Sequence, residues 1–239
     1  SRLFLIQEVL MRLPRWVSST ALVLALAVPT PAVAAPITIG QIDTFQDGTT
    51  QGWQINLLNL APPQLFPVVF PTGGPGGTGD AFLLSGSNGT MEPSGRMTVL
   101  NAAQWAGDYL AGGVTAIAMD VANFGPTDVN LRLLFEDAMG APPTNVAVST
   151  NSILVPATGD WTRVKFPITP GSLTALQGNV NTALSNTTIL RIFDSVALAF
   201  PGAPSVALLG FDNIVALPEP ASLLLLGTGV LLVMRRRRR

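Results

Sequence analysis

Hydrophobic and polar positions alternate with a period of two along several stretches of the chain. In Val129–Glu136 the odd-numbered positions are apolar and most of the even-numbered ones are polar, and Ile117–Val121 and Arg163–Ile168 show the same alternation. Successive side chains of a strand point to opposite faces, so this pattern predicts half-buried strands. Apolar content predicts further strands near Ile37–Phe45, Trp53–Leu58, Ala81–Leu84, Met97–Leu100, Val146–Val148, Ile189–Phe193 and Val206–Val215.

Clusters of glycine, proline, asparagine and aspartate separate these stretches, as in Pro71–Asp80 and Ala138–Asn145. Helical signal is thin, and we expect only a turn or two around Ala102–Leu110 and near Ser172–Gln177. Many short strands joined by turns are typical of an all-β protein, a β-sandwich or jelly roll. We place this domain at residues 36–217.

The first 35 residues have the pattern of a targeting segment. Arg12 and Arg15 follow Met11, an apolar stretch covers Thr20–Val28, and the small-residue site Ala32-Val33-Ala34 comes next. This order is typical of a secretory signal peptide, which would form a helix and be removed after Ala34 or Ala35. We interpret the residues before Met11 as an upstream extension.

Charge and composition narrow the classes of function. Residues 36–217 hold five lysines and arginines against twelve aspartates and glutamates, a net charge of −7. A nucleic-acid-binding domain carries a basic face, so we expect no nucleic acid partner. The chain has no cysteine and no histidine. This excludes Ser-His-Asp and Cys-His catalysis and the usual zinc ligands, and it leaves a hard cation such as calcium. We expect no enzyme activity.

One glycine-rich segment imitates a nucleotide-binding motif. Gly74–Gly79 fits the spacing G-x-G-x-x-G, but the residues that follow predict a strand, and no acid stands near position 100. The dinucleotide-binding mechanism needs a helix N-terminus at this place and an acid about 20 residues later. We therefore interpret the segment as a loop between strands.

Two aromatic residues are candidates for ligand contact. Trp105 and Tyr109 are four residues apart and would share a face of a short helix. On the surface they could stack against a sugar ring. The alternative, which we favour, is that they close the end of the core, because large aromatic side chains are mostly buried.

The segments Ile42–Ile55 and Leu208–Leu217 resemble the first and last strands of galactose-binding-like jelly-roll domains, a group that includes many carbohydrate-binding modules. The resemblance implies that the two strands are neighbours and that their oxygens hold a structural calcium ion. Carried over, Gln46, Asp47 and Asp212 become candidate calcium ligands. Many such domains have glutamate where this chain has Gln46.

The end of the chain resembles the PEP-CTERM sorting signal of exopolysaccharide-producing Gram-negative bacteria, a segment also known as the ice-binding protein C-terminal domain. Its motif is Pro218-Glu219-Pro220, followed by an apolar segment and an arginine cluster. The resemblance implies that an exosortase cuts beside the motif. The alternative is a permanent tail anchor, which accounts for the apolar segment and the arginines but not for the motif. Ice binding itself needs a regular array of threonines, which is absent.

The parts of the tail suit this role physically. Prolines keep the motif extended and free of helix. Ala221–Met234 has 14 residues, about 21 Å as a helix against a membrane core of about 30 Å. The cluster Arg235, Arg236, Arg237, Arg238 and Arg239 then stops transfer, and long arginine side chains help a short transmembrane helix to reach both faces.

The sequence therefore predicts an exported, non-enzymatic surface or extracellular-matrix protein in three parts, at residues 1–35, 36–217 and 218–239. The expected partners are the Sec machinery, the inner membrane, an exosortase and a polysaccharide. The alternative is a calcium-stabilised carbohydrate-binding module.

Overall fold

The computed structural model describes residues 34–55, 67–137 and 142–219, and these residues form two antiparallel sheets. The predicted signal helix and transmembrane helix lie outside these residues. Within them, no helix is long and apolar enough to cross a membrane.

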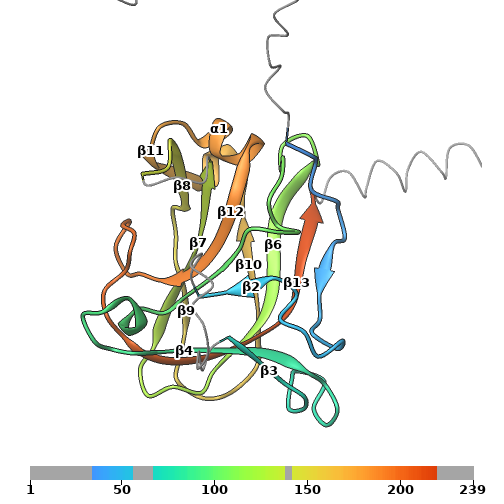
Figure 1. The fold of residues 1–239 in the computed structure, drawn as a ribbon, viewed down its shortest axis with the longest axis vertical. Coiled ribbons are helices and arrows are strands. Elements are labelled where there is room, and N and C mark those ends of the chain that lie inside the picture. Colours follow the sequence, from blue (N-terminus) through green and yellow to red (C-terminus); the bar gives the residue numbers. More distant parts are fainter. Residues whose placement is uncertain (1–33, 56–66, 138–141, 220–239) are drawn as a thin grey trace, which may run out of the picture. The chain divides into compact units, whose positions relative to one another are not determined.

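The first sheet is six-stranded, with the order β10-β6-β13-β4-β3, and β1 also pairs with β13. Strand β13 is long and lies against β6 along most of its length, with β4 beside its first half and β1 beside its second half (Figure 1). The strands are β1 Ile42–Asp43, β3 Val68–Phe70, β4 Phe82–Asn88, β6 Val114–Asn123, β10 Thr162–Pro167 and β13 Val206–Pro218.

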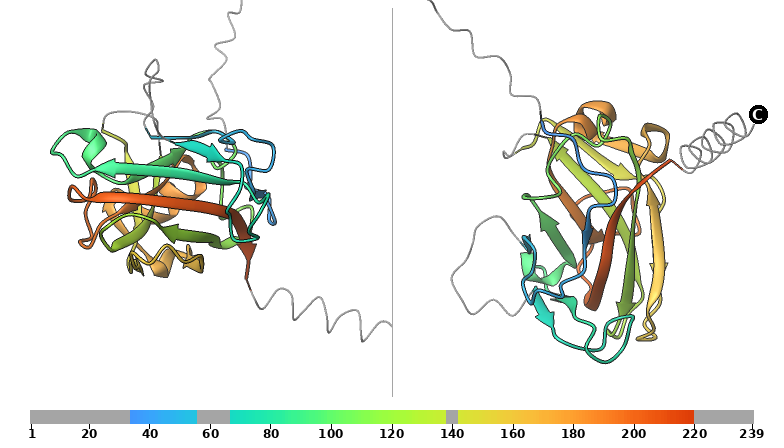
Figure 2. Two further views of the ribbon diagram at one scale, coloured as in Figure 1. Left: turned by 90° about the horizontal axis from the view of Figure 1, so that it is seen from below. Right: turned by 90° about the vertical axis from the view of Figure 1, so that its right-hand side faces the viewer.

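The second sheet is seven-stranded, with the order β11-β8-β7-β12-β5-β2, and β9 also pairs with β7. It faces the first sheet in the views of Figure 2. Its strands are β2 Trp53–Gln54, β5 Thr98–Asn101, β7 Val129–Asp137, β8 Asn145–Ser149, β9 Ile153–Val155, β11 Leu173–Gln177 and β12 Thr187–Asp194. The helices are α1 Val180–Ser185 and the 3₁₀ turns η1 Pro93–Gly95 and η2 Pro170–Ser172.

The core lies between the two sheets, and the alternation in the sequence explains it. Ile117 and Val121 of β6 and Leu131 and Phe135 of β7 are fully buried in one cluster of apolar side chains. The class predicted from the sequence, an all-β sandwich, is confirmed. A strand with one apolar face must bury that face against another layer, and here the second layer is a second sheet.

The two short helices predicted from the sequence are wrong. Residues 102–110 form turns, and residues 173–177 form strand β11, which pairs with β8. Hydrogen bonding along the sheet edge outweighs the weak helical preference of five residues. The helix that does form, α1, follows Asn179, whose side chain accepts hydrogen bonds from Asn181 N and Thr182 N. Such an N-cap is a sequence signal for a helix start.

Candidate functional site

Trp105 and Tyr109 lie in the core and do not form an exposed platform. Both are fully buried. The Trp105 indole donates a hydrogen bond of 2.7 Å to Asp43 Oδ2, and the Tyr109 hydroxyl donates one of 2.8 Å to Trp105 O. Burial raises the pKa of Tyr109 well above its usual value, and the charge of Asp43 adds to the rise. The prediction that these two residues bind a ligand is therefore wrong, and the alternative, that they close the core, is confirmed.

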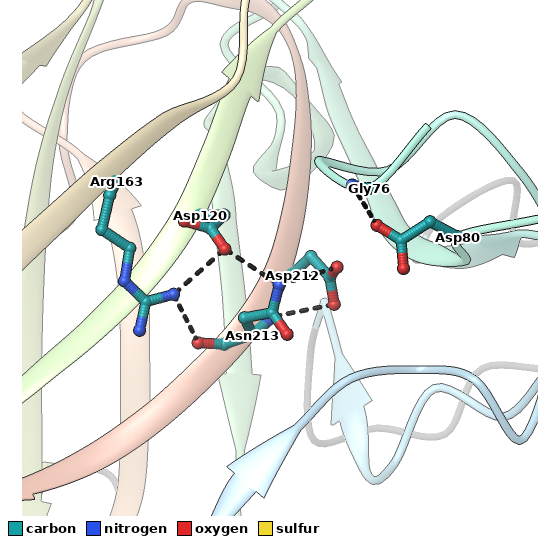
Figure 3. Close-up of polar contacts among 6 residues, drawn as sticks. All are labelled: Gly76, Asp80, Asp120, Arg163, Asp212 and Asn213. Atoms are coloured by element: carbon teal, nitrogen blue, oxygen red, sulfur yellow. Dashed lines mark hydrogen bonds and ion pairs between the residues drawn. The ribbon is translucent and has the colours of Figure 1, made fainter. Parts of the chain in front are cut away.

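A group of charged and polar side chains crosses the first sheet near the middle of β13 (Figure 3). We call these residues, Asp120, Arg163, Asp212 and Asn213, the acidic strip. Asp212 of β13 lies opposite Asp120 of β6. Asp120 Oδ2 accepts hydrogen bonds from Arg163 Nη1 at 3.1 Å and from Asn213 Nδ2 at 2.9 Å. Asn213 has a φ of 49°, and the pairing of β13 with β6 shifts register after Asp212. Asparagine tolerates this left-handed conformation, so the shift forms a bulge that turns the Asn213 amide back to Asp120.

Asp212 is the buried member of this strip, with 1% of its surface exposed. Its Oδ1 accepts a 2.7 Å hydrogen bond from the backbone N–H of Asn213. Burial raises the pKa of Asp212 to about 7, and the negative charges of Asp80 and Asp120 add to the rise. The Asn213 N–H and the charge of Arg163 act in the opposite direction. A carboxyl in this position can take up or release a proton, or balance a bound cation, near neutral pH.

The glycine-rich loop holds the next carboxylate. Asp80 Oδ2 accepts a 2.6 Å hydrogen bond from Gly76 N, and a Cβ atom at Gly74 would lie 2.6 Å from the same oxygen (Figure 3). The loop therefore needs glycine at position 74 to seat the carboxylate. It leads into strand β4, as the sequence predicts, and no helix follows it.

The three predicted calcium ligands lie in different surroundings. Gln46 donates a 2.6 Å hydrogen bond from Nε2 to Asp80 Oδ1, and the charge of Asp80 in turn acts on Asp212. Asp47 instead accepts hydrogen bonds from Thr49 N and Oγ1 within its own turn, and these bonds lower its pKa. In the part of the chain that the structure describes, no three acidic side chains gather closely enough to hold a metal ion. Calcium here would need amide or backbone oxygens as well, and it stays a prediction.

An aromatic surface that the sequence did not reveal lies beside the strip. We define it by Phe70, Phe82, Phe124 and Trp161, whose neighbouring ring centroids are 5.2–6.0 Å apart. Phe70 and Phe124 are 46% and 40% exposed. The rings meet over Gly210 of β13, where a Cβ atom would lie 2.8 Å from the Trp161 ring.

The aromatic surface and the strip share one face of the sheet. Gly210 and Asp212 are two residues apart on β13, and Trp161 and Arg163 are two apart at the start of β10, so each pair points to the same side. Glycine at position 210 was the available sequence signal, because an isolated glycine within a strand marks close approach of another group.

The sorting motif begins inside the fold. Pro218 is the last residue of β13, where it lies opposite Val114, and Glu219 is exposed. Pro220 and Arg235–Arg239 lie outside the described residues.

Comparison with protein families identifies the end of the chain. Residues 216–239 match the model of the PEP-CTERM protein-sorting motif, so the predicted signal at the end of the chain is confirmed. This motif indicates an exported protein that passes through the membrane to the cell surface. A search of curated proteins finds no match.

Similar solved structures include enzymes and binding modules. An exo-β-agarase is 12% identical with a TM-score of 0.49; 77% of this chain is covered, but only 26% of the agarase. A family 11 carbohydrate-binding module from Clostridium thermocellum, in complex with a β-1,3-1,4-mixed-linked tetrasaccharide, is 13% identical with a TM-score of 0.47, covering 76% and 99% of the two chains. A CBM28 module specific for non-crystalline cellulose is 14% identical with a TM-score of 0.46, covering 79% and 99%.

Proposed function

We propose that this chain is a non-enzymatic surface or extracellular-matrix protein, associated with exopolysaccharide, that an exosortase sorts through its C-terminal tail. The observation that carries the proposal is the PEP-CTERM match over residues 216–239, directly continuous with β13. A sandwich that ends in this motif is delivered at the outer face of the inner membrane of a Gram-negative cell. The Sec machinery would carry it there.

The acidic strip supports a non-enzymatic role. A general acid must reach the atom that it protonates, within about 3 Å. Asp212 has a pKa suited to proton transfer but is 1% exposed, and its neighbour Asp120 is paired with Arg163 and Asn213. Neither carboxyl is placed to meet a substrate as one of two catalytic acids.

Replacement of Glu219 tests the sorting proposal. Glu219 is exposed just after the last strand, so Glu219→Ala removes the only charge of the motif without disturbing the sandwich. In a host that contains an exosortase, we expect the wild type to lose its tail and the variant to stay membrane-bound at the mass of the uncut chain. The matched control is Glu92→Ala, at an exposed glutamate in a distant loop, which should be cut like the wild type. A mature wild-type protein that retains Arg235–Arg239 would contradict the proposal.

The aromatic surface favours a second candidate function, binding of polysaccharide. Exposed apolar patches bordered by polar groups mark sites of interaction. Here the exposed rings share a face of the sheet with Arg163 and Asn213, which offer donors and acceptors for hydroxyl groups. A sugar has both an apolar ring face and hydroxyl groups, so it fits such a border between apolar and polar surface.

Glycan-array binding of the processed protein tests this candidate. Trp161→Ala removes a partly buried ring from the aromatic surface and should weaken binding at least tenfold. The matched control is Phe200→Ala, at a partly exposed ring that packs on Phe193 of the other sheet. If both variants bind as the wild type does, the aromatic surface is not the polysaccharide site.

A further inference from the structure

The first described residues of the chain and the end of β13, which leads to the sorting motif, lie at the same end of the sandwich. At the N-terminal side, Ala35 O accepts a 2.8 Å hydrogen bond from Asp108 N. At the C-terminal side, Pro218 lies opposite Val114. Asp108 and Val114 are the two ends of a single turn, so one turn contacts both junctions. In Figure 1 the start of the blue chain and the head of the β13 arrow lie together at the upper end of β6.

Glycine allows this close arrangement. A Cβ atom at Gly112 would collide with the backbone oxygen of Ile37, and one at Gly107 would lie 2.5 Å from Ala35 O. The N-terminal segment is also tied to the last strand, because Gly40 N donates a 2.9 Å hydrogen bond to Ala216 O. We call this region, residues 34–42, 108–114 and 216–218, the tether end.

The tether end is apolar and almost free of charge. Ile39, Leu110 and Ile42 of β1 are 45%, 40% and 48% exposed. The Ile39 side chain lies against Gly113, whose N–H bonds to Leu110 O. The only charged side chain in these segments is that of Asp108, which is buried and accepts a hydrogen bond from Ala111 N. Residues 36–217 as a whole carry a net charge of −7.

We propose that the tether end rests on the lipid surface while the tail is inserted. The inference rests on the proposed sorting function and adds a contact between the folded domain and the bilayer. From Pro218 to Ala221, the first residue of the apolar segment, there are three residues, a span of at most about 10 Å. The headgroup layer on one side of a bilayer is about 5–8 Å thick. A tether this short brings the end of the sandwich to the headgroups.

The distribution of charge favours the same orientation. Apolar side chains enter the boundary between headgroups and acyl chains, as on interfacial helices. Acidic side chains are repelled by anionic lipids. Asp212 precedes Pro218 by six residues on β13. With Ile39 and Leu110 facing the lipid, the acidic strip therefore lies away from the bilayer.

Fluorescence quenching in vesicles tests the contact. Because the chain has no cysteine, one cysteine at a time can be introduced and labelled in the full chain. Thr38→Cys and Ala111→Cys flank the apolar residues, and Met91→Cys reports on the opposite end, where Asn88 pairs with Val206. In vesicles of phosphatidylethanolamine and phosphatidylglycerol with a headgroup-attached quencher, labels at positions 38 and 111 should be quenched at least threefold more than the label at position 91.

Flotation and a matched substitution separate the two proposals. Protein that does not float with vesicles lacks an inserted tail, and the sorting proposal then fails. Floating protein with equal quenching at all three labels overturns only the contact. The double substitution Ile39→Asp, Leu110→Asp should leave flotation intact and lower quenching at position 111 at least twofold. The same change at exposed Val196 and Leu198 should leave quenching unchanged. Equal melting temperatures check that both variants fold.

Discussion

Pro218, the first residue of the sorting motif, lies opposite Val114 at the last paired position of β13 and β6. Two residues earlier, Ala216 is fully buried. The motif therefore has no spacer between itself and the sandwich. An enzyme that reads Pro218-Glu219-Pro220 must work directly beside the folded domain, and the end of β13 limits its access.

Lengthening this connection should speed processing. An eight-residue Gly-Ser insertion after Leu217 detaches Pro218 from Val114 and extends the tether by up to about 28 Å. We expect at least a twofold faster loss of the tail in a pulse-chase measurement. The same insertion after Leu198, in an exposed loop before β13, is the control and should leave the rate unchanged. A slower rate with the first insertion would mean that the enzyme needs the motif close to the fold.

Asp212 should make stability depend on pH. Its pKa is about 7 in the folded protein, against about 3.9 in an unfolded chain. Between these values the folded state holds one more proton than the unfolded state, so the free energy of unfolding falls as pH rises from about 4 to 7. Three pKa units correspond to at most about 4 kcal/mol. Above pH 7 the folded protein carries the full free-energy cost of burying the ionised Asp212 carboxylate.

Asp212→Asn tests the predicted direction of this pH dependence. The variant cannot ionise, so it should be more stable than the wild type by about 1–3 kcal/mol at pH 8 in chelator, and similar to it at pH 4. Urea unfolding across this range measures the difference. Asp160→Asn, at an exposed aspartate, is the control and should follow the wild type. A wild type that gains stability from pH 4 to 7 relative to Asp212→Asn would contradict the raised pKa.

Much of the fold could be predicted from the sequence, and the failures have local causes. Leu131 and Phe135 alternate with polar residues on β7 and are buried as expected. Residues 173–177 fit a helical turn as well as an edge strand, and only pairing with β8 decides between them. The aromatic surface could not be foreseen, because Phe70 and Phe124 are far apart in the sequence and meet only through the order of the strands.

Calcium should raise the melting temperature if the resemblance to galactose-binding-like domains extends to a metal. A cation near Gln46 and Asp212 would favour the ionised form of Asp212 and remove the penalty of its burial. We expect a higher melting temperature in 1 mM calcium chloride than in chelator, and no such difference in Asp212→Ala. Asp47→Asn tests whether Asp47 is a calcium ligand or only a residue of its loop, because Asp47 already accepts hydrogen bonds within its own turn. Identical wild-type melting curves in both solutions would remove the metal from this site.

The last prediction concerns Asp43, a buried carboxylate that joins the two sheets. Its Oδ2 accepts hydrogen bonds of 2.7 Å from the indole N–H groups of both Trp53 and Trp105. Asp43 lies on β1 of the first sheet, and Trp53 lies on β2 of the second. The two indole rings are 6.3 Å apart between centroids. The carboxylate therefore fixes the positions of both buried indole rings.

Removal of this carboxylate should be among the most destabilising changes in the domain. Asp43→Ala leaves two buried indole donors without a partner, at about 1–3 kcal/mol each, so we expect a loss of about 3–5 kcal/mol in urea unfolding followed by tryptophan fluorescence. Asp43→Asn retains one acceptor oxygen and should lose less. Asp160→Ala, at an exposed aspartate, should stay within about 0.5 kcal/mol of the wild type. A loss below about 1 kcal/mol for Asp43→Ala would show that the indoles find other partners and that Asp43 is not what joins the sheets.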